Sequence, residues 1–403
     1  MNQARADALA ARSHLAAHGW IARNAEAFRH LPPPDAALWL GDADPPGAGA
    51  VDARDWELEP LAPALADRVE ARWLDAADPG QRRELLAGLS LLGDDAAAPF
   101  AWAHRALLRQ GLRLRVRPAS DGGELFLRAR WRGHGVQAPL LVIELLPGAR
   151  CTLLETHEAC ADCDDTVQNL QVHVVGGAHS SLRHLRVALP AAHDRIAQHV
   201  HVRLDEDSSY RQVLLASGSS YHLQRTVLEL DRARAQARTG SVLLGADTCL
   251  DQQVLAHHGA RDTDSSIAAL ALGSGAAKLV ANAHTTIAAG SDDAQTRQRL
   301  TGIPTRGQPR LVLRPHLEIH HDQVQAAHGA TWGALPEDAL FHARQRGIGE
   351  LAAKAMIVEG MAAAVFARVL DDPDALDMAG LEPLLARAIA AHLAAPAKEL
   401  NHG

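Results

Sequence analysis

The stretch Gly111-Leu112-Arg113-Leu114-Arg115-Val116-Arg117 marks the place where the hydrophobic pattern of this chain changes. Apolar and basic residues alternate in it, and a period of two is typical of a β-strand with one buried face. Before it, apolar residues recur at helical spacing, and after it short apolar or alternating runs continue to about residue 318. The sequence therefore predicts a long β-region that follows a helical one.

Short turns separate these runs and recur along the chain. The first four begin at Pro147, Gly176, Asp205 and Asp231, about 26 to 29 residues apart, with no helical segment between them. A doubly wound fold would need a helix between successive strands, whereas a solenoid of strands needs none. We expect a mainly β protein with α ends, whose core is a right-handed parallel β-helix. A β-sandwich is the second choice, because alternating strands and tight turns fit it locally as well.

Helical patterns lie on both sides of the β-region. They cover residues 3–30, about 60–92, 99–110, about 351–369 and about 375–393. We therefore predict an N-terminal helical region over residues 1–98, a β-helix core over 99–332 and a C-terminal helical domain over 333–403. The fourth helix carries a narrow apolar seam from Leu351 to Val369, which packs either on its own domain or on a partner.

Composition limits the function classes. The chain has 403 residues, of which 47% are hydrophobic and 22% charged, so a large core is expected rather than disorder. A net charge of -8 with interspersed signs argues against nucleic acid as the main partner. No run is long and apolar enough to span a membrane, and the four cysteines fit a reducing compartment, so we expect a cytoplasmic protein.

Motifs for catalysis are missing from the sequence. It contains no G-x-x-x-x-G-K-S/T for nucleotide hydrolysis and no G-x-S-x-G nucleophile turn. We expect that the chain is not an enzyme by itself.

One local run has the spacing of metal ligands. His157, Cys160 and Cys163 follow one another at intervals of three, which suits zinc or a cluster, although a second cysteine pair is missing. A solvent-exposed turn with incidental thiols is the other interpretation. A stand-alone zinc protein is one hypothesis for the whole chain.

Five short motifs follow one another between residues 314 and 348. They are Arg314-Pro315-His316-Leu317-Glu318-Ile319, Asp322-Gln323-Val324, His328-Gly329-Ala330-Thr331, Ala339-Leu340-Phe341 and Arg344-Gln345-Arg346-Gly347-Ile348. This set closely resembles the C-terminal signature of the SufB/SufD family, which commonly has K-P-x-L-E-I, D-D-V, H-G-A-T and L-F-Y-L-R-S-R-G-I in the same order and at nearly the same spacing. The Cys and the Glu-His-Glu cluster of the SufB branch are missing, so the SufD branch is preferred. Many chains of that branch have a Cys two residues before the signature histidine, where this chain has Ala326.

The resemblance implies a scaffold subunit for iron-sulfur cluster assembly. It would pair with SufB through the last strands of the two β-helices and bind the SufC ATPase through its C-terminal helices. A transient cluster shared with SufB is implied at that junction, and the assembled complex can carry reduced flavin.

The same resemblance assigns roles to particular residues. His328 matches the histidine placed at the junction, where a neutral imidazole can bind iron. Glu318 and Asp322 are candidates to support His328 or His321, and solvent-exposed acidic residues are the alternative. The SufC-binding segment would include Leu340, Phe341, Arg344, Arg346, Gly347 and Ile348.

A different class of protein also fits a β-helix. Carbohydrate-active enzymes use this fold with acidic or basic residues along one face. Their binding grooves are usually rich in aromatic residues, whereas this β-region has few. We therefore keep a β-helix carbohydrate-active enzyme as the alternative function.

Overall fold

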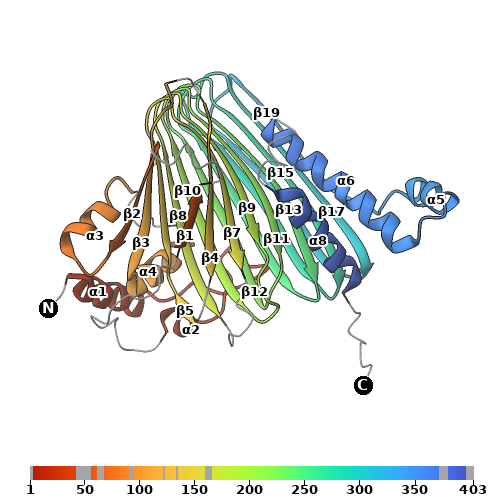
Figure 1. Ribbon diagram of the computed structural model, residues 1–403, viewed down its shortest axis with the longest axis horizontal. Coiled ribbons are helices and arrows are strands. Elements are labelled where there is room, and N and C mark those ends of the chain that lie inside the picture. The colour runs from red at the N-terminus through yellow and green to blue at the C-terminus, as the bar shows by residue number, and fades with distance from the viewer. Residues whose placement is uncertain are drawn as a thin grey trace.

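The computed structural model describes residues 3–41, 56–60, 68–89, 95–120, 123–132, 135–158, 166–371 and 380–395. Two sheets form its body, and from residue 140 onward the strands alternate between them, so that each pair of consecutive strands makes one turn of a solenoid. The solenoid has about seven turns (Figure 1). The first sheet contains β1 (Trp56–Pro60), β4 (Leu125–Arg132), β7 (Arg150–Glu158), β9 (Ser181–Ala188), β11 (Ser209–Ser217), β13 (Gln236–Ala246), β15 (Asp264–Gly275), β17 (Ala294–Gly307) and β19 (Val324–Trp332).

The second sheet runs alongside the first. Its path contains β2 (Val69–Asp75), β3 (Gln110–Val116), β6 (Leu140–Leu145), β8 (Val167–Gly176), β10 (Arg195–Leu204), β12 (Tyr221–Leu230), β14 (Cys249–His258), β16 (Lys278–Ile287) and β18 (Arg310–Ile319), and β5 (Val136–Gln137) pairs with β8. Neighbouring strands are parallel throughout the two sheets except for β1 with β4 and β2 with β3. The prediction of a parallel β-helix is confirmed, and the parallel pairing excludes the β-sandwich.

The alternating residues from Gly111 to Arg117 lie on β3, and their side chains point in the directions that the pattern predicts. Leu112, Leu114 and Val116 are fully buried in the core between the sheets. Arg113 and Arg115 point to the other side and both contact Glu144 on the next strand. Stacked coils thus share one apolar interior, which Leu, Val and Ala fill.

A column of turns closes the coils at one corner. At each level one residue has a positive φ, and these residues are His179, Asp207, Arg234, Asp262 and Asp293. The backbone N–H of each donates to a carbonyl of the next coil, as from His179 to Glu206 at 2.9 Å. Aspartate tolerates the left-handed region better than most residues, which explains its repeated use here.

The N-terminal helices lie on the outer face of the second sheet. They are α1 (Gln3–His18), α2 (Ala36–Leu40), α3 (Pro79–Leu85) and α4 (Ala98–Leu107). A cluster around Phe28, Trp39 and Phe100 packs on Ala197 and Leu223 of that face. This layer reaches β18, where Val312 packs on the same cluster.

The prediction of a helix over about residues 60–92 is wrong for the described residues before Pro79. Residues 69–75 form β2, which pairs antiparallel with β3, and only Pro79–Leu85 is helical. Glu70, Ala71 and Leu74 favour a helix by propensity, but pairing with the first coil outweighs that preference.

Three helices follow the last strand, namely α5 (Glu337–Gln345), α6 (Glu350–Leu370) and α8 (Leu381–Ala394). α6 and α8 lie on the outer face of the first sheet. Val358, Ala362, Val365 and Val369 of α6 are buried against that sheet. No helix among the described residues is long and apolar enough to cross a membrane.

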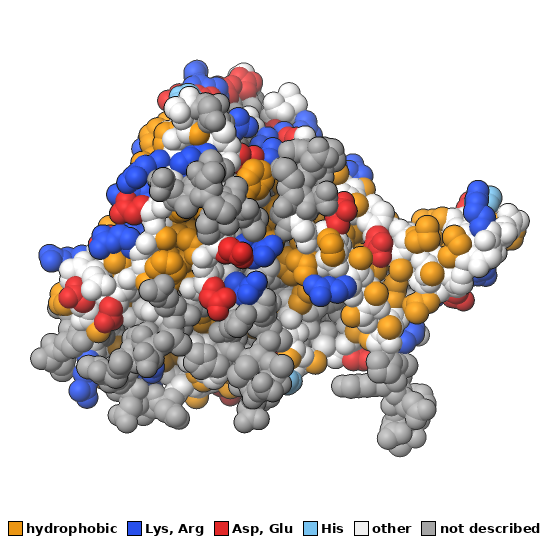
Figure 2. Space-filling model, viewed as in Figure 1, with side chains coloured by type: hydrophobic (Ala, Val, Ile, Leu, Met, Phe, Trp, Pro, Cys, Tyr) orange, Lys and Arg blue, Asp and Glu red, His pale blue; other side chains and the backbone are white. Residues whose placement is uncertain are grey.

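The other end of α6 extends beyond the sheets. There α6 and α5 form a projecting arm at the far right of Figure 1, defined here as residues 337–357. Phe341, Leu351 and Met356 on this arm are each more than half exposed. Figure 2 shows the hydrophobic side chains along it in orange.

Candidate functional site at the last coil

The last coil of the solenoid leaves both sheets open at one end. β18 is the final strand of the second sheet and β19 the final strand of the first, so within the described chain each is paired on one side only. Large apolar side chains are exposed at this end, including Ile319 and Trp332, whose exposed fractions are 44% and 59%. Unpaired edge groups next to exposed apolar residues mark a surface that another chain can cover.

His328 lies on the inner side of this open coil. It pairs in register with Gln298 of β17, just as Ala330 pairs with Leu300. Leu300 is a core residue and Ala330 packs on the core, so the alternate residue His328 faces the same interior. Its side chain is exposed at the open end. The fold therefore presents this imidazole at the mouth of the solenoid.

A buried polar chain lies directly behind His328. Gln298 donates through Nε2 to Thr285 Oγ1 at 2.8 Å and to the carbonyl of His316 at 2.9 Å. Thr296 contacts Ser265, and the Ser265 Oγ lies 2.8 Å from Nε2 of His258. His258 and Ser265 are thus hydrogen-bonded inside the solenoid.

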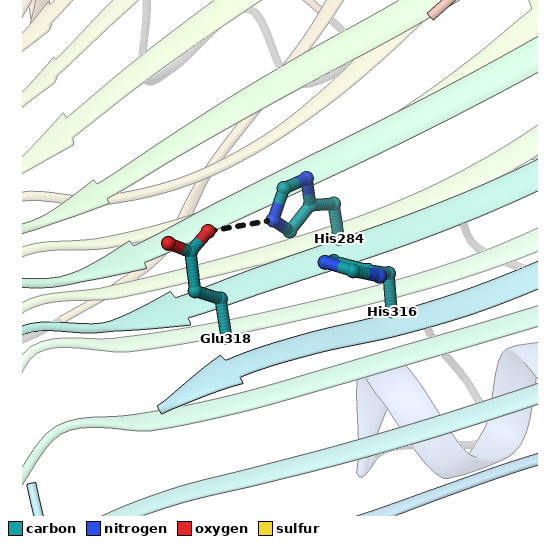
Figure 3. Close-up of side chains that lie close together, drawn as sticks. All are labelled: His284, His316 and Glu318. Carbon is teal, nitrogen blue, oxygen red and sulfur yellow. Dashed lines mark ion pairs between the residues drawn. The ribbon is translucent and has the colours of Figure 1, made fainter. Parts of the chain in front are cut away.

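Glu318 lies on the outer face of β18. It contacts His320 and His284, whereas the sequence suggested His328 or His321. Its Oε1 lies 3.0 Å from Nε2 of His320, and its Oε2 lies 3.6 Å from Nε2 of His284 on β16 (Figure 3). The hydrogen bond with His320 lowers the pKa of the Glu318 carboxyl. Burial lowers the pKa of His284, and His316 beside it adds to that effect. The Glu318 carboxylate and the neutral His284 imidazole are therefore the prevailing forms of these two groups at neutral pH.

Asp322 lies in the turn between β18 and β19 and is exposed. Its carbonyl accepts a hydrogen bond from the N–H of Val324 at 3.1 Å. The neighbouring His321 pairs instead with Asp292, 2.6 Å from Nε2 to Oδ1. Whether either acidic residue supports His328 stays a prediction.

His157 lies inside the solenoid and belongs to a buried polar network. Its Nε2 is 2.8 Å from Oε1 of Glu155, whose Oε2 is 2.8 Å from Nε2 of His184. Burial raises the pKa of Glu155, but the charge of Arg186 and the two histidine hydrogen bonds outweigh this and hold the pKa well below its ordinary value. Cys160 and Cys163 lie outside the described residues, so the predicted metal run stays untested.

The segment predicted to bind SufC forms α5 and the turn after it. Leu340 is buried and anchors α5, whereas Phe341, Arg344 and Arg346 are exposed. Gly347 has φ +75° in the turn between α5 and α6, a conformation that favours glycine. Ile348 is half-buried and packs with the C-terminal helices.

Comparison with known proteins fits this architecture. The family model for the SUF system FeS cluster assembly SufBD core domain matches residues 128–361. The chain belongs to this SufBD core family. A curated relative is the iron-sulfur cluster assembly protein SufD of Escherichia coli (strain K12), which is 22% identical over 253 residues. The alignment covers 62% of this chain and 57% of the relative, so the chain spans little more than half of that protein's length.

The SufBD core of this chain also places residues together that the sequence did not single out. His284 and His316 are direct partners on β16 and β18 although 32 positions separate them. The recurring turns carry the signal, because equivalent positions one coil apart lie side by side. Arg186 follows the same rule, since it is the register partner of Glu155 on β7 and β9.

Proposed function

We propose that this chain is a SufD-type scaffold subunit for iron-sulfur cluster assembly, which acts in a complex and not as an enzyme by itself. It would pair with SufB through β18 and β19 and bind the SufC ATPase through the arm. The observation that carries the proposal is the open last coil, in a member of the SufBD core family, with His328 at its mouth.

The chemistry of this end supports pairing with a sister subunit. The free edges of β18 and β19 offer backbone donors and acceptors, and a strand of similar pitch would continue both sheets. Ile319 and Trp332 would become buried, which favours association through the hydrophobic effect.

His328 is the residue we assign to the cluster shared with SufB. An imidazole nitrogen is a competent iron ligand, as in Rieske centres. With Ala326 in place of a family cysteine, this chain would offer nitrogen rather than sulfur at that point, and thiolates would come from the partner. Glu318 and Asp322 belong to the same coil, where they would contribute negative charge near the junction.

The arm supports an interaction with SufC. Phe341, Leu351 and Met356 are large apolar side chains of the arm that nothing in the described chain covers. Arg344 and Arg346 are exposed on the same arm and would pair with acidic residues of a partner.

Reduced flavin is an expectation about the assembled complex. One recess of the described chain lies between Gly88 and strands β8, β10 and β12, with room for little more than a water molecule. A three-ring isoalloxazine does not fit this recess.

The carbohydrate-active enzyme is not favoured, because the matching family is one of iron-sulfur cluster assembly. The test of this alternative is an assay of the purified chain alone on polyuronides, in which we expect no activity.

Co-purification with tagged SufB of the same organism tests the proposed pairing. We expect a stable complex, and we expect Trp332→Asp to reduce its yield at least tenfold, because a charge would be buried at the junction. Leu9→Asp on α1, another exposed apolar position, is the matched control. Equal yields for native and Trp332→Asp chains would contradict pairing through this coil.

A further inference from the structure

Two histidines and one glutamate converge on the outer face of the last two strands of the second sheet. They are His284 of β16 and His316 and Glu318 of β18, and each offers one ligating atom within 4.8 Å of the others. Figure 3 shows the Glu318 carboxylate directed toward the His284 ring, with the His316 ring beside it. The two rings are 4.5 Å apart between centroids and nearly perpendicular, at 83°.

The pairing of the strands fixes this arrangement. His284 and His316 are direct register partners, and Glu318 is two positions further along β18 on the same face. Because β16 is held between β14 and β18, its histidine has little freedom to move away. The site is thus built on strands rather than on a loop, which favours defined geometry.

One nitrogen of this group is left without a hydrogen bond. Nε2 of His284 is buried and has no hydrogen-bond partner. The nearest carboxylate oxygen, Oε2 of Glu318, lies 3.6 Å away, which is too far for a hydrogen bond. Two ligands of one tetrahedral cation at 2.0–2.1 Å lie about 3.3 Å apart. A cation between these two atoms would therefore satisfy both with a small movement.

We infer that His284, His316 and Glu318 form an open binding site for a first-row divalent transition metal ion of the Zn²⁺ and Fe²⁺ class. Two imidazoles and one carboxylate select these ions over Mg²⁺ and Ca²⁺, which prefer oxygen ligands alone. His316 and Glu318 are exposed, so coordination positions would stay accessible to water or to a further ligand.

His320 would orient the carboxylate. Its Nε2 lies 3.0 Å from Oε1 of Glu318, the oxygen that does not face His284. A hydrogen bond on the second oxygen is the arrangement that commonly fixes a metal-binding carboxylate. His320 is therefore a positioning residue of this site.

The inference does not depend on the proposed function. It needs neither SufB nor SufC, and it uses neither His328 nor the arm. A chain that binds no metal here could still pair through its last coil, and a chain that binds metal here could fail to pair.

Metal binding to the full-length chain tests the inference. The protein is stripped with a chelator and titrated with Zn²⁺, and anaerobically with Fe²⁺, in competition with a chromophoric chelator. A Cys160→Ser, Cys163→Ser background removes the thiols of the other metal run. We expect one equivalent to bind, with affinity lowered at least tenfold by His284→Ala and by Glu318→Gln. His321→Ala, a histidine of the next turn paired with Asp292, should leave the affinity unchanged.

Two further measurements keep the result interpretable. X-ray absorption of the zinc complex should show nitrogen and oxygen ligands at about 2.0–2.1 Å with the scattering pattern of imidazole. Zn²⁺ should raise the melting temperature of the native chain more than that of Glu318→Gln, whose own fold is checked by circular dichroism. No binding by the native chain, or unchanged affinity in the folded Glu318→Gln variant, would overturn the site.

Discussion

Gln298 and His328 lie at the same level on adjacent strands and face the same interior, yet Gln298 is only 3% exposed whereas His328 is exposed. The difference comes from position, because β19 covers β17 whereas β19 itself ends the first sheet. A second subunit that added one more coil would bury His328 as β19 buries Gln298. The exposure of this imidazole is thus a consequence of the open end, which the proposed function uses.

The arm predicts a partner-specific effect. Phe341→Ala combined with Leu351→Ala should weaken SufC binding at least tenfold, because it removes two of the three large apolar side chains exposed on the arm. The free energy of unfolding should change by no more than about 0.5 kcal/mol, since both residues are exposed. Binding is measured by titration calorimetry, with Leu9→Ala as control. Retained affinity would show that the ATPase binds elsewhere.

The buried network predicts a large loss of stability. Glu155→Gln leaves the Arg186 guanidinium, 3.8 Å away, without a buried counter-charge. Removal of one partner of such a pair should lower the free energy of unfolding by about 3–5 kcal/mol. Urea denaturation measures it. The exposed pair partner Glu206 provides the control, where Glu206→Gln should cost less than about 1 kcal/mol. A loss below 1 kcal/mol for Glu155→Gln would contradict the network's role.

The burial of His258 should make the free energy of unfolding decrease at acid pH. Burial lowers its pKa to about 4, below the ordinary value of 6.5. The unfolded chain therefore takes up the proton first, so this stability is present above pH 6.5 and is lost as the pH falls toward 4.

The size of this effect can be measured by unfolding at two pH values. Between pH 7 and pH 5 the contribution of His258 to the free energy of unfolding should fall by roughly 2 kcal/mol. His258→Gln should reduce the stability difference between these pH values by about that amount, whereas His193→Gln at an exposed position should not. An unchanged difference in His258→Gln would contradict this source of acid sensitivity.

The fold was largely predictable because its physical signals are local and repeated. Leu112, Leu114 and Val116 showed the strand period, and the turns from Pro147 to Asp231 showed the coil length. The strand β2 was missed because its residues favour a helix by themselves and become a strand only by pairing with β3.

The candidate site was less predictable, because the register between stacked strands decides which of its side chains lie next to one another. The sequence placed His328 in the last coil through its motif, but grouped Glu318 with it by nearness in sequence. Strand register brings Glu318 to His284, 34 positions earlier in the chain, on the outer face of the second sheet. Side chains that meet only through stacking need the register before they can be grouped.

Anaerobic reconstitution of the complex with SufB and SufC tests the central claim most directly. Iron and acid-labile sulfide per complex, with the visible absorption of the cluster, are compared for native, His328→Ala and His321→Ala chains at equal subunit stoichiometry. We expect the native and His321→Ala complexes to load a cluster and the His328→Ala complex to assemble normally but load several-fold less. Equal loading by the His328→Ala complex would contradict the role of the open coil in cluster assembly.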